Sequence, residues 1–241
     1  MMQILVLPTS GLAARAAAQF VGRTLRARPA SVLGLPTGRT MIPFYREIAR
    51  LHARGSCSFR RATTFNLDEF IGLRPGHPGS YRAFMHHHLI DAVDLPEASA
   101  HFPDIDGRDP GAYDDRIVRT GGMDLCVLGI GLTGHVGFNE PAAHLSARTH
   151  RVRLLPATRR ANAYLFHGLA RVPKYAVSMG MATILNSRTV ILLATGAGKA
   201  AIVRRALAGP VTTRVPASLI QTHPNALVVL DRAAAAKFLS S

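Results

Sequence analysis

The chain has 241 residues, of which 48% are hydrophobic, and a formal net charge of +15 at pH 7 because 29 Lys and Arg outnumber 14 Asp and Glu. This length and apolar content suit one large α/β domain over residues 1–241. No stretch reaches the roughly 18 consecutive apolar residues of a membrane span, and the N-terminus lacks the basic segment of a signal peptide. Two distant cysteines, Cys57 and Cys126, exclude a disulfide framework. We therefore expect a cytoplasmic protein that does not associate with membranes.

The positive charge is concentrated in the second half of the chain. From Pro141 to the C-terminus, Asp231 is the one acid against fourteen Lys and Arg. Such a surplus is typical of proteins that bind nucleic acid or an anionic small molecule. The sequence has no helix-turn-helix signature, no zinc-finger spacing and no interleaving of aromatic and basic residues. We therefore predict a phosphorylated small-molecule substrate and no nucleic-acid partner.

Short apolar runs alternate with longer segments of helical spacing along the chain. Strands are predicted at residues 3–7, 31–35, 62–67, 124–129, 151–155, 175–179, 189–194 and 226–230. Helices are predicted at residues 12–28, 41–53, 80–92, 110–120, 158–169, 198–208 and 232–239. This alternation predicts a single-domain, Rossmann-like, three-layer α/β/α sandwich with a mostly parallel central sheet.

Residues 124–141 combine a strand with a glycine-rich loop. An apolar run at residues 125–128 leads into four closely spaced glycines, Gly129, Gly131, Gly134 and Gly137. Glycine adopts positive φ angles and lets a ligand approach the backbone closely. The loop also carries His135 and Glu140, which can transfer protons, and ligands of open α/β sheets bind at the carboxyl ends of strands. Taken alone, the stretch is equally well explained as a solvated glycine-rich turn.

Three other predicted strands also end in polar loops. The first ends in an anion-binding combination of N–H groups, hydroxyls and a guanidinium, at Thr37, Gly38, Arg39 and Thr40. The second ends in Asp68 and Glu69, which point to opposite sides, so that at most one faces a given pocket as a general base. The third leads to Lys199 at a glycine-rich helix start, which suits a phosphate. Each loop also has an ordinary structural explanation.

Neither a nucleotide P-loop nor a metal site is predicted. In the pattern G-x-x-x-x-G-K before Lys199, the first glycine would fall at Leu193. The consecutive histidines at residues 86–88 diverge by about 100° each on a helix, so they cannot converge on one ion. Asp104 and Asp106 have no supporting ligands in the sequence around them.

Five segments in order along the chain carry a family resemblance. They are Gly-Leu-Pro-Thr-Gly at 34–38, Thr-Phe-Asn-Leu-Asp-Glu at 64–69, His-Pro-Gly-Ser-Tyr at 77–81, Gly-His-Val-Gly-Phe-Asn-Glu-Pro at 134–141 and Val-Pro-Lys-Tyr-Ala at 172–176. With them, the chain resembles the glucosamine-6-phosphate deaminases, also called glucosamine-6-phosphate isomerases. Residues 121–129 and 212–219 also resemble the galactosamine-6-phosphate members. The resemblance covers about residues 30–231.

The resemblance implies conversion of an aminosugar phosphate to a ketose phosphate and ammonia without a cofactor. Asp68 stands at the position of the base that, in this family, moves a proton from C2 to C1. His135 matches the residue that assists ring opening at O5, and Glu140 matches the carboxylate that orients it. The implied substrate-binding positions are Thr37, Gly38, Arg39, Thr40, Glu69, Gly131 and Lys199, with Arg39 standing where the family usually has glycine.

Two departures from the family pattern bear on catalysis and phosphate binding. Thr133 stands where the family has Asp or Asn to orient the histidine, and its hydroxyl carries no charge. Tyr164 stands where larger members place a phosphate-binding arginine, and Arg159 or Arg160 could take over that role. His150 and Val152 replace basic residues of the allosteric site of hexameric members. We therefore expect a monomer or small homo-oligomer and not an allosteric hexamer.

Two other functions compete with deamination. A 6-phosphogluconolactonase has a related fold, but that family usually follows its Asp-Glu pair with Arg, where this chain has Phe70, and lacks the Phe-Asn-Glu-Pro of residues 138–141. A catalytically weakened sugar-phosphate-binding domain is favoured by Thr133. The retained Asp68, His135 and Glu140 favour the enzyme.

Overall fold

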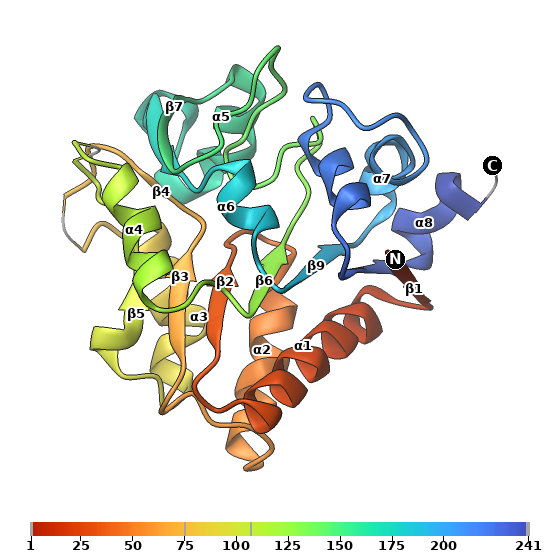
Figure 1. Ribbon diagram of the computed structural model, residues 1–241. Coiled ribbons are helices and arrows are strands. Elements are labelled where there is room, and N and C mark those ends of the chain that lie inside the picture. Colours follow the sequence, from red (N-terminus) through yellow and green to blue (C-terminus); the bar gives the residue numbers. More distant parts are fainter. Residues whose placement is uncertain (1, 75, 107, 240–241) are drawn as a thin grey trace.

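The centre of the molecule is a seven-stranded sheet, seen in a computed structural model that describes residues 2–74, 76–106 and 108–239 (Figure 1). In spatial order its strands are β1 (Gln3–Leu7), β10 (Ala226–Asp231), β9 (Thr189–Ala194), β6 (Leu125–Leu128), β2 (Val32–Leu35), β3 (Thr63–Asn66) and β5 (Ala100–His101). Every neighbouring pair of these strands is parallel. The predicted mostly parallel central sheet is confirmed.

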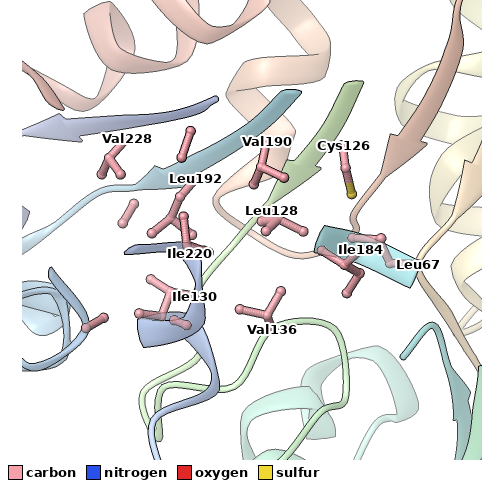
Figure 2. Close-up of a cluster of buried hydrophobic side chains, with 14 of the residues drawn as sticks. Leu67, Cys126, Leu128, Ile130, Val136, Ile184, Val190, Leu192, Ile220 and Val228 are labelled. Carbon is pink, nitrogen blue, oxygen red and sulfur yellow. The ribbon is translucent and has the colours of Figure 1, made fainter. Parts of the chain in front are cut away.

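Helices cover both faces of this sheet because successive side chains of a buried strand point to opposite sides. On β6, Leu125 and Val127 belong to a core shared with α1 (Ser10–Ala27), α2 (Met41–Ala53) and α3 (Tyr81–His88). On the other face, Cys126 and Leu128 belong to a core shared with α4 (Gly111–Arg119), α6 (Met181–Leu185), α7 (Ala200–Leu207) and α8 (Arg232–Leu239). Figure 2 shows this second core beneath β6, its neighbour β9 and β10, which lies on the far side of β9. The predicted three layers are confirmed.

Most helix ends follow local signals in the sequence. The Thr9 hydroxyl caps α1 by accepting the N–H of Leu12 at 3.3 Å, and Pro29 follows its last turn. Helices α2 and α8 and strand β9 have the predicted bounds. The helix predicted at 158–169 is instead divided into α5 (Pro156–Asn162) and two 3₁₀ turns, η3 (Ala163–Phe166) and η4 (Leu169–Arg171). It breaks because His167 and Gly168 adopt φ angles of 52° and 137°.

A second sheet, which the strand pattern did not predict, lies beside the first. Its order is β4 (Asp68–Phe70), β8 (Tyr175–Ser178) and β7 (His150–Arg153), and both pairings are antiparallel. The chain leaves the main sheet after β3 and enters the second sheet at Asp68. Buried aromatic residues, including Phe70, Phe138 and Phe166, fill the space between this sheet, α3 and η3.

Among the described residues, every helix is too short or too polar to span a bilayer.

Candidate active site

Loops from four adjacent strands meet at one edge of the central sheet. Strands β9, β6, β2 and β3 are neighbours, and parallel strands end at the same edge. A cleft of about 330 Å³ lies there. Nine of the predicted site residues line it, namely Thr37, Gly38, Arg39, Thr40, Asp68, Gly131, Thr133, His135 and Lys199. The loops that sequence reasoning singled out separately thus form one site.

The cleft lies at a reversal of strand order. From β2 the chain moves outward to β3, whereas from β6 it crosses to β9 on the opposite side. Strands β2 and β6 are neighbours, so the loops that follow them separate and leave a crevice between them. The position of the cleft follows from topology, before any side chain is considered.

The glycines of the central loop make room for His135. A Cβ atom on Gly131 would lie 2.1 Å from the His135 ring, so the imidazole packs directly on the Gly131 backbone. The Gly131 N–H donates to the His135 carbonyl at 2.9 Å, which closes the loop. Gly134 and Gly137 adopt φ angles of 89° and 58°, which other residues avoid. The loop therefore needs glycine for both conformation and space.

Two side chains contact the same nitrogen of His135. The Thr133 hydroxyl lies 2.8 Å from Nδ1, and the Oε2 atom of Glu140 lies 3.4 Å from it. Because Nδ1 is engaged, Nε2 is the ring nitrogen available to a ligand in the cleft. Thr133 therefore orients the imidazole without adding charge, and Glu140 supplies the negative charge.

Glu140 lies behind His135 with a side chain that is almost fully buried. Burial opposes its charge, but His135, with smaller contributions from Thr158 and the backbone of Leu155, holds the pKa of Glu140 below its ordinary value. Neither carboxylate oxygen makes a hydrogen bond of normal geometry with the described residues. The imidazole is therefore the main electrostatic partner of this carboxylate.

Asp68 is the carboxylate that faces the cleft. Burial first, and then the charge of Glu69, raise the pKa of Asp68 well above its ordinary value. Strand β4 sets its position, because Asp68 pairs with Ser178 of β8 and the Ser178 hydroxyl accepts the Phe138 N–H at 3.0 Å. A Cβ atom on Gly137 would lie 3.5 Å from Asp68 Oδ2, so the glycine-rich loop packs closely beside the carboxylate.

Glu69, predicted as a substrate-binding residue, does not line the cleft and binds backbone N–H groups instead. Its Oε1 accepts the N–H groups of Phe70 at 2.8 Å and Tyr81 at 2.9 Å, and its Oε2 accepts that of Arg82 at 2.8 Å. The side chain is 1% exposed. Because Tyr81 and Arg82 begin α3, Glu69 caps that helix. As expected, only one carboxylate of the Asp68–Glu69 pair faces the pocket, and it is that of Asp68.

Two cations lie in the cleft. Lys199 donates from Nζ to the Ile130 carbonyl at 2.6 Å, and its pKa is lowered by burial and by the nearby charge of Arg39. The Arg39 guanidinium lies over the Tyr164 ring, 5.0 Å from its centroid. The turn at residues 37–40, in which Gly38 adopts a φ of 110°, lines the same cleft and leads into α2. This wall of the cleft suits an anion.

The arginines expected to replace a phosphate ligand at Tyr164 do not line the cleft. Arg159 instead donates from Nη2 to the carbonyls of Leu169 at 3.1 Å and Val172 at 2.9 Å, which fixes the chain after α5. Arg160 is exposed and is also absent from the lining. The positions of Arg159 and Arg160 therefore give no support to the suggestion that either one compensates.

Sequence reasoning missed three polar residues of the cleft, Tyr81, Thr158 and Asn162. The Tyr81 hydroxyl donates to Asn162 Oδ1 at 3.3 Å, which links α3 to α5. Tyr81 belongs to the His-Pro-Gly-Ser-Tyr segment and could have been found there, whereas no pattern marked Asn162.

Among the described residues, no group of three or more His, Cys, Asp or Glu side chains is placed to hold a metal ion.

Comparison with known proteins reveals close relatives. The family described as glucosamine-6-phosphate isomerases/6-phosphogluconolactonase covers residues 9–229. A glucosamine-6-phosphate deaminase of Geobacillus is 44% identical over 90% of this chain and 88% of its own length, and one of Arthrobacter is 43% identical over 97% and 92%. A solved monomeric glucosamine-6-phosphate deaminase superposes with a TM-score of 0.94 at 37% identity, covering 98% of this chain and 100% of that one. A 6-phosphogluconolactonase of Trypanosoma brucei shares the fold, with a TM-score of 0.78 at 20% identity over 98% of each chain.

Proposed function

The chain belongs to the family of glucosamine-6-phosphate isomerases and 6-phosphogluconolactonases, and within that family we propose that it is a glucosamine-6-phosphate deaminase. The reaction converts the aminosugar phosphate and water to the ketose 6-phosphate and ammonia. The observation that carries the proposal is the placement of Asp68 and His135 in one cleft with Arg39 and Lys199. This arrangement offers two proton-transfer groups beside a site for the phosphate.

Ring opening is the step assigned to His135. The ring oxygen O5 must gain a proton while the hydroxyl on C1 loses one, and a single imidazole can carry out both transfers in turn. Thr133 and Glu140 engage Nδ1, so Nε2 exchanges protons with the sugar. The charge of Glu140 stabilises the protonated imidazole during the exchange.

Proton transfer between carbon atoms is the step assigned to Asp68. In the open-chain aminosugar, its carboxylate takes the proton from C2 and delivers it to C1. The C1 carbonyl oxygen gains a proton and the amino nitrogen loses one, so that C1 becomes an alcohol and C2 an imine. Water adds to this imine, and ammonia leaves as the C2 carbonyl of the ketose forms. Burial that raises the pKa of Asp68 makes the ionised carboxylate a stronger base. The chemistry is an isomerisation followed by hydrolysis, and we expect it to need no cofactor.

We also propose that the protein is a monomer or a small homo-oligomer without hexamer-type allostery. The supporting relative is the solved deaminase described as monomeric, which this chain matches over its full length. His150 and Val152, on β7, stand at positions that are basic in hexameric members. Light scattering and substrate saturation curves test the proposal, with a small assembly and hyperbolic curves expected.

Ammonia release from a panel of hexosamine 6-phosphates tests the function. We expect release from glucosamine 6-phosphate or galactosamine 6-phosphate, with formation of the matching ketose 6-phosphate. Hydrolysis of 6-phosphogluconolactone is the control, and turnover of the lactone alone would assign the protein to the lactonase activity. Binding of the aminosugar phosphates without any turnover would instead indicate a sugar-phosphate-binding protein.

A further inference from the structure

Arg39 is a cation held at the cleft by an aromatic ring. No hydrogen bond or ion pair joins its guanidinium to the described residues, and the guanidinium lies over the face of Tyr164, 5.0 Å from the ring centroid. A free arginine side chain samples many rotamers, and ordering it for a ligand costs conformational entropy. The contact with the ring restricts the guanidinium, and its N–H groups, which have no partner among the described residues, stay available to an anion.

Arg39 and Lys199 are close enough to affect each other. The charge of Arg39 contributes to lowering the pKa of Lys199, after burial. Two neighbouring cations that line the same cleft repel each other, and an anion bound between them relieves this repulsion. Neither cation is paired with a carboxylate among the described residues. A group with two negative charges, such as a phosphate, therefore fits between them.

Tyr164 lies on a segment that is itself fixed across the cleft. It belongs to η3, directly after α5, and Asn162 two residues earlier accepts the hydrogen bond from Tyr81 of α3. Phe166, two residues later, packs against Phe70 of β4 with ring centroids 5.1 Å apart. The Tyr164 ring, although 47% exposed, is thus held between two anchored neighbours. It can serve as a fixed support for Arg39.

We propose that Tyr164 is a positioning residue whose ring holds Arg39 so that Arg39 and Lys199 bind the same phosphate group. This deepens the proposed function and rests on it, because it takes the substrate to be phosphorylated. In this arrangement Tyr164 does not contact the phosphate directly and acts on it only through Arg39. The phosphate is then bound by cations from the turn before α2 and the loop after β9.

The test compares Tyr164→Leu, which removes the ring, with Tyr164→Phe, which keeps it. A cation–π contact of this exposure corresponds to about a three- to tenfold change in affinity. We expect Tyr164→Leu to weaken binding of inorganic phosphate, measured by calorimetry, and to raise KM for glucosamine 6-phosphate by this factor while kcat changes less than twofold. Tyr164→Phe should restore most of the affinity. In an Arg39→Gln background, Tyr164→Leu should have no further effect.

A matched control lies outside the cleft. Arg151 stacks on Tyr175 at 4.3 Å, and Tyr175 is 37% exposed, so Tyr175→Leu removes a similar pair without touching the cleft lining. It should leave phosphate affinity unchanged. The proposal is overturned if Tyr164→Leu binds phosphate as tightly as the unaltered protein, if Tyr164→Phe is as weak as Tyr164→Leu, or if Tyr164→Leu weakens binding equally with and without Arg39.

The phosphate arm separates this proposal from the proposed function. If the protein releases no ammonia from any hexosamine 6-phosphate, deamination is refuted, and calorimetry with inorganic phosphate still decides the role of Tyr164. If ammonia is released but the Tyr164 variants bind phosphate alike, the function stands and the role of Tyr164 is refuted.

Discussion

Asp68 is the residue whose role can be tested most directly. The carboxylate lines the cleft, and Asn has nearly the same shape but cannot accept a carbon-bound proton. We expect Asp68→Asn to lower kcat by about 10²–10⁴-fold, which is typical for loss of a positioned base, while substrate still binds. Steady-state ammonia release and calorimetric binding measure the two effects. A variant with more than a tenth of the original kcat would exclude Asp68 as the base.

The same substitution should stabilise the protein at neutral pH. A carboxyl whose pKa is raised by folding contributes stability below its ordinary pKa, about 3.9, and loses it as pH rises through the raised value. Asn does not titrate, so the advantage of Asp68→Asn should grow as pH rises above about 4 and vanish below it. Each kcal/mol gained would raise Tm by about 2–4 °C. An advantage that does not depend on pH would show that the charge of Asp68 costs no stability.

Thr133 tests which step limits the reaction. Its hydroxyl contacts His135 Nδ1 at 2.8 Å but carries no negative charge, which a carboxylate at this position would add. We expect ring opening to limit the rate, so Thr133→Asp should raise kcat on the cyclic substrate and have little effect on the reverse reaction of open-chain ketose phosphate with ammonia. Thr133→Val, which removes the hydrogen bond, should lower forward kcat, and Thr133→Ser should not. Unchanged or lower forward turnover in Thr133→Asp would place the limiting step elsewhere.

At the scale of elements, the capping of α3 is open to a stability test. Glu69 accepts three backbone N–H groups and Ser80 accepts one, from Ala83 at 3.0 Å. Because Glu69→Ala leaves buried donors unpaired, we expect a loss of about 2–4 kcal/mol, against about 1 kcal/mol for Ser80→Ala. Glu69→Gln keeps one acceptor and should fall between them. Urea unfolding measures all three, and equal losses for Glu69→Ala and Ser80→Ala would contradict the capping role.

The sequence predicted the elements that depend on local patterns. Helix α2 and strand β9 have clear periodicity and the predicted bounds, and the central strands are parallel, as the alternation of strands and helices predicted. The second sheet was missed because β4 has only three residues, and its pairing with β8 joins positions more than a hundred residues apart. The break at His167 was missed because a positive φ at a non-glycine residue has no pattern in the sequence.

The residues of the candidate site likewise fall into those that local sequence patterns marked and those that only the structure shows. Loop chemistry marked Asp68, His135 and Lys199, because each polar side chain follows a predicted strand. The capping role of Glu69 depends on α3, twelve residues further along the chain, and so could be seen only in three dimensions. The stacking of Arg39 on Tyr164 joins segments that no local rule connects.

At the scale of the whole molecule, the question is how the net charge of +15 acts on an anionic substrate. Salt screens charges over about 10 Å at 0.1 M and about 3 Å at 1 M, so attraction from the distant surface should fade with salt before contacts inside the cleft do. We expect kcat/KM for glucosamine 6-phosphate to fall several-fold between 0.01 M and 1 M KCl, mainly through KM.

Lys199→Ala separates the cleft from the surface. Loss of a charge-assisted hydrogen bond to the phosphate corresponds to roughly 1.5–3 kcal/mol, so KM should rise about 10- to 150-fold at any one salt concentration. Arg119→Ala removes the same charge from the exposed end of α4, outside the cleft lining, and should raise KM less than twofold. The salt dependence should stay unchanged in Lys199→Ala and become slightly shallower in Arg119→Ala. If both variants change KM equally, Lys199 acts only through the overall charge, and the phosphate must be bound by the turn at residues 37–40 alone.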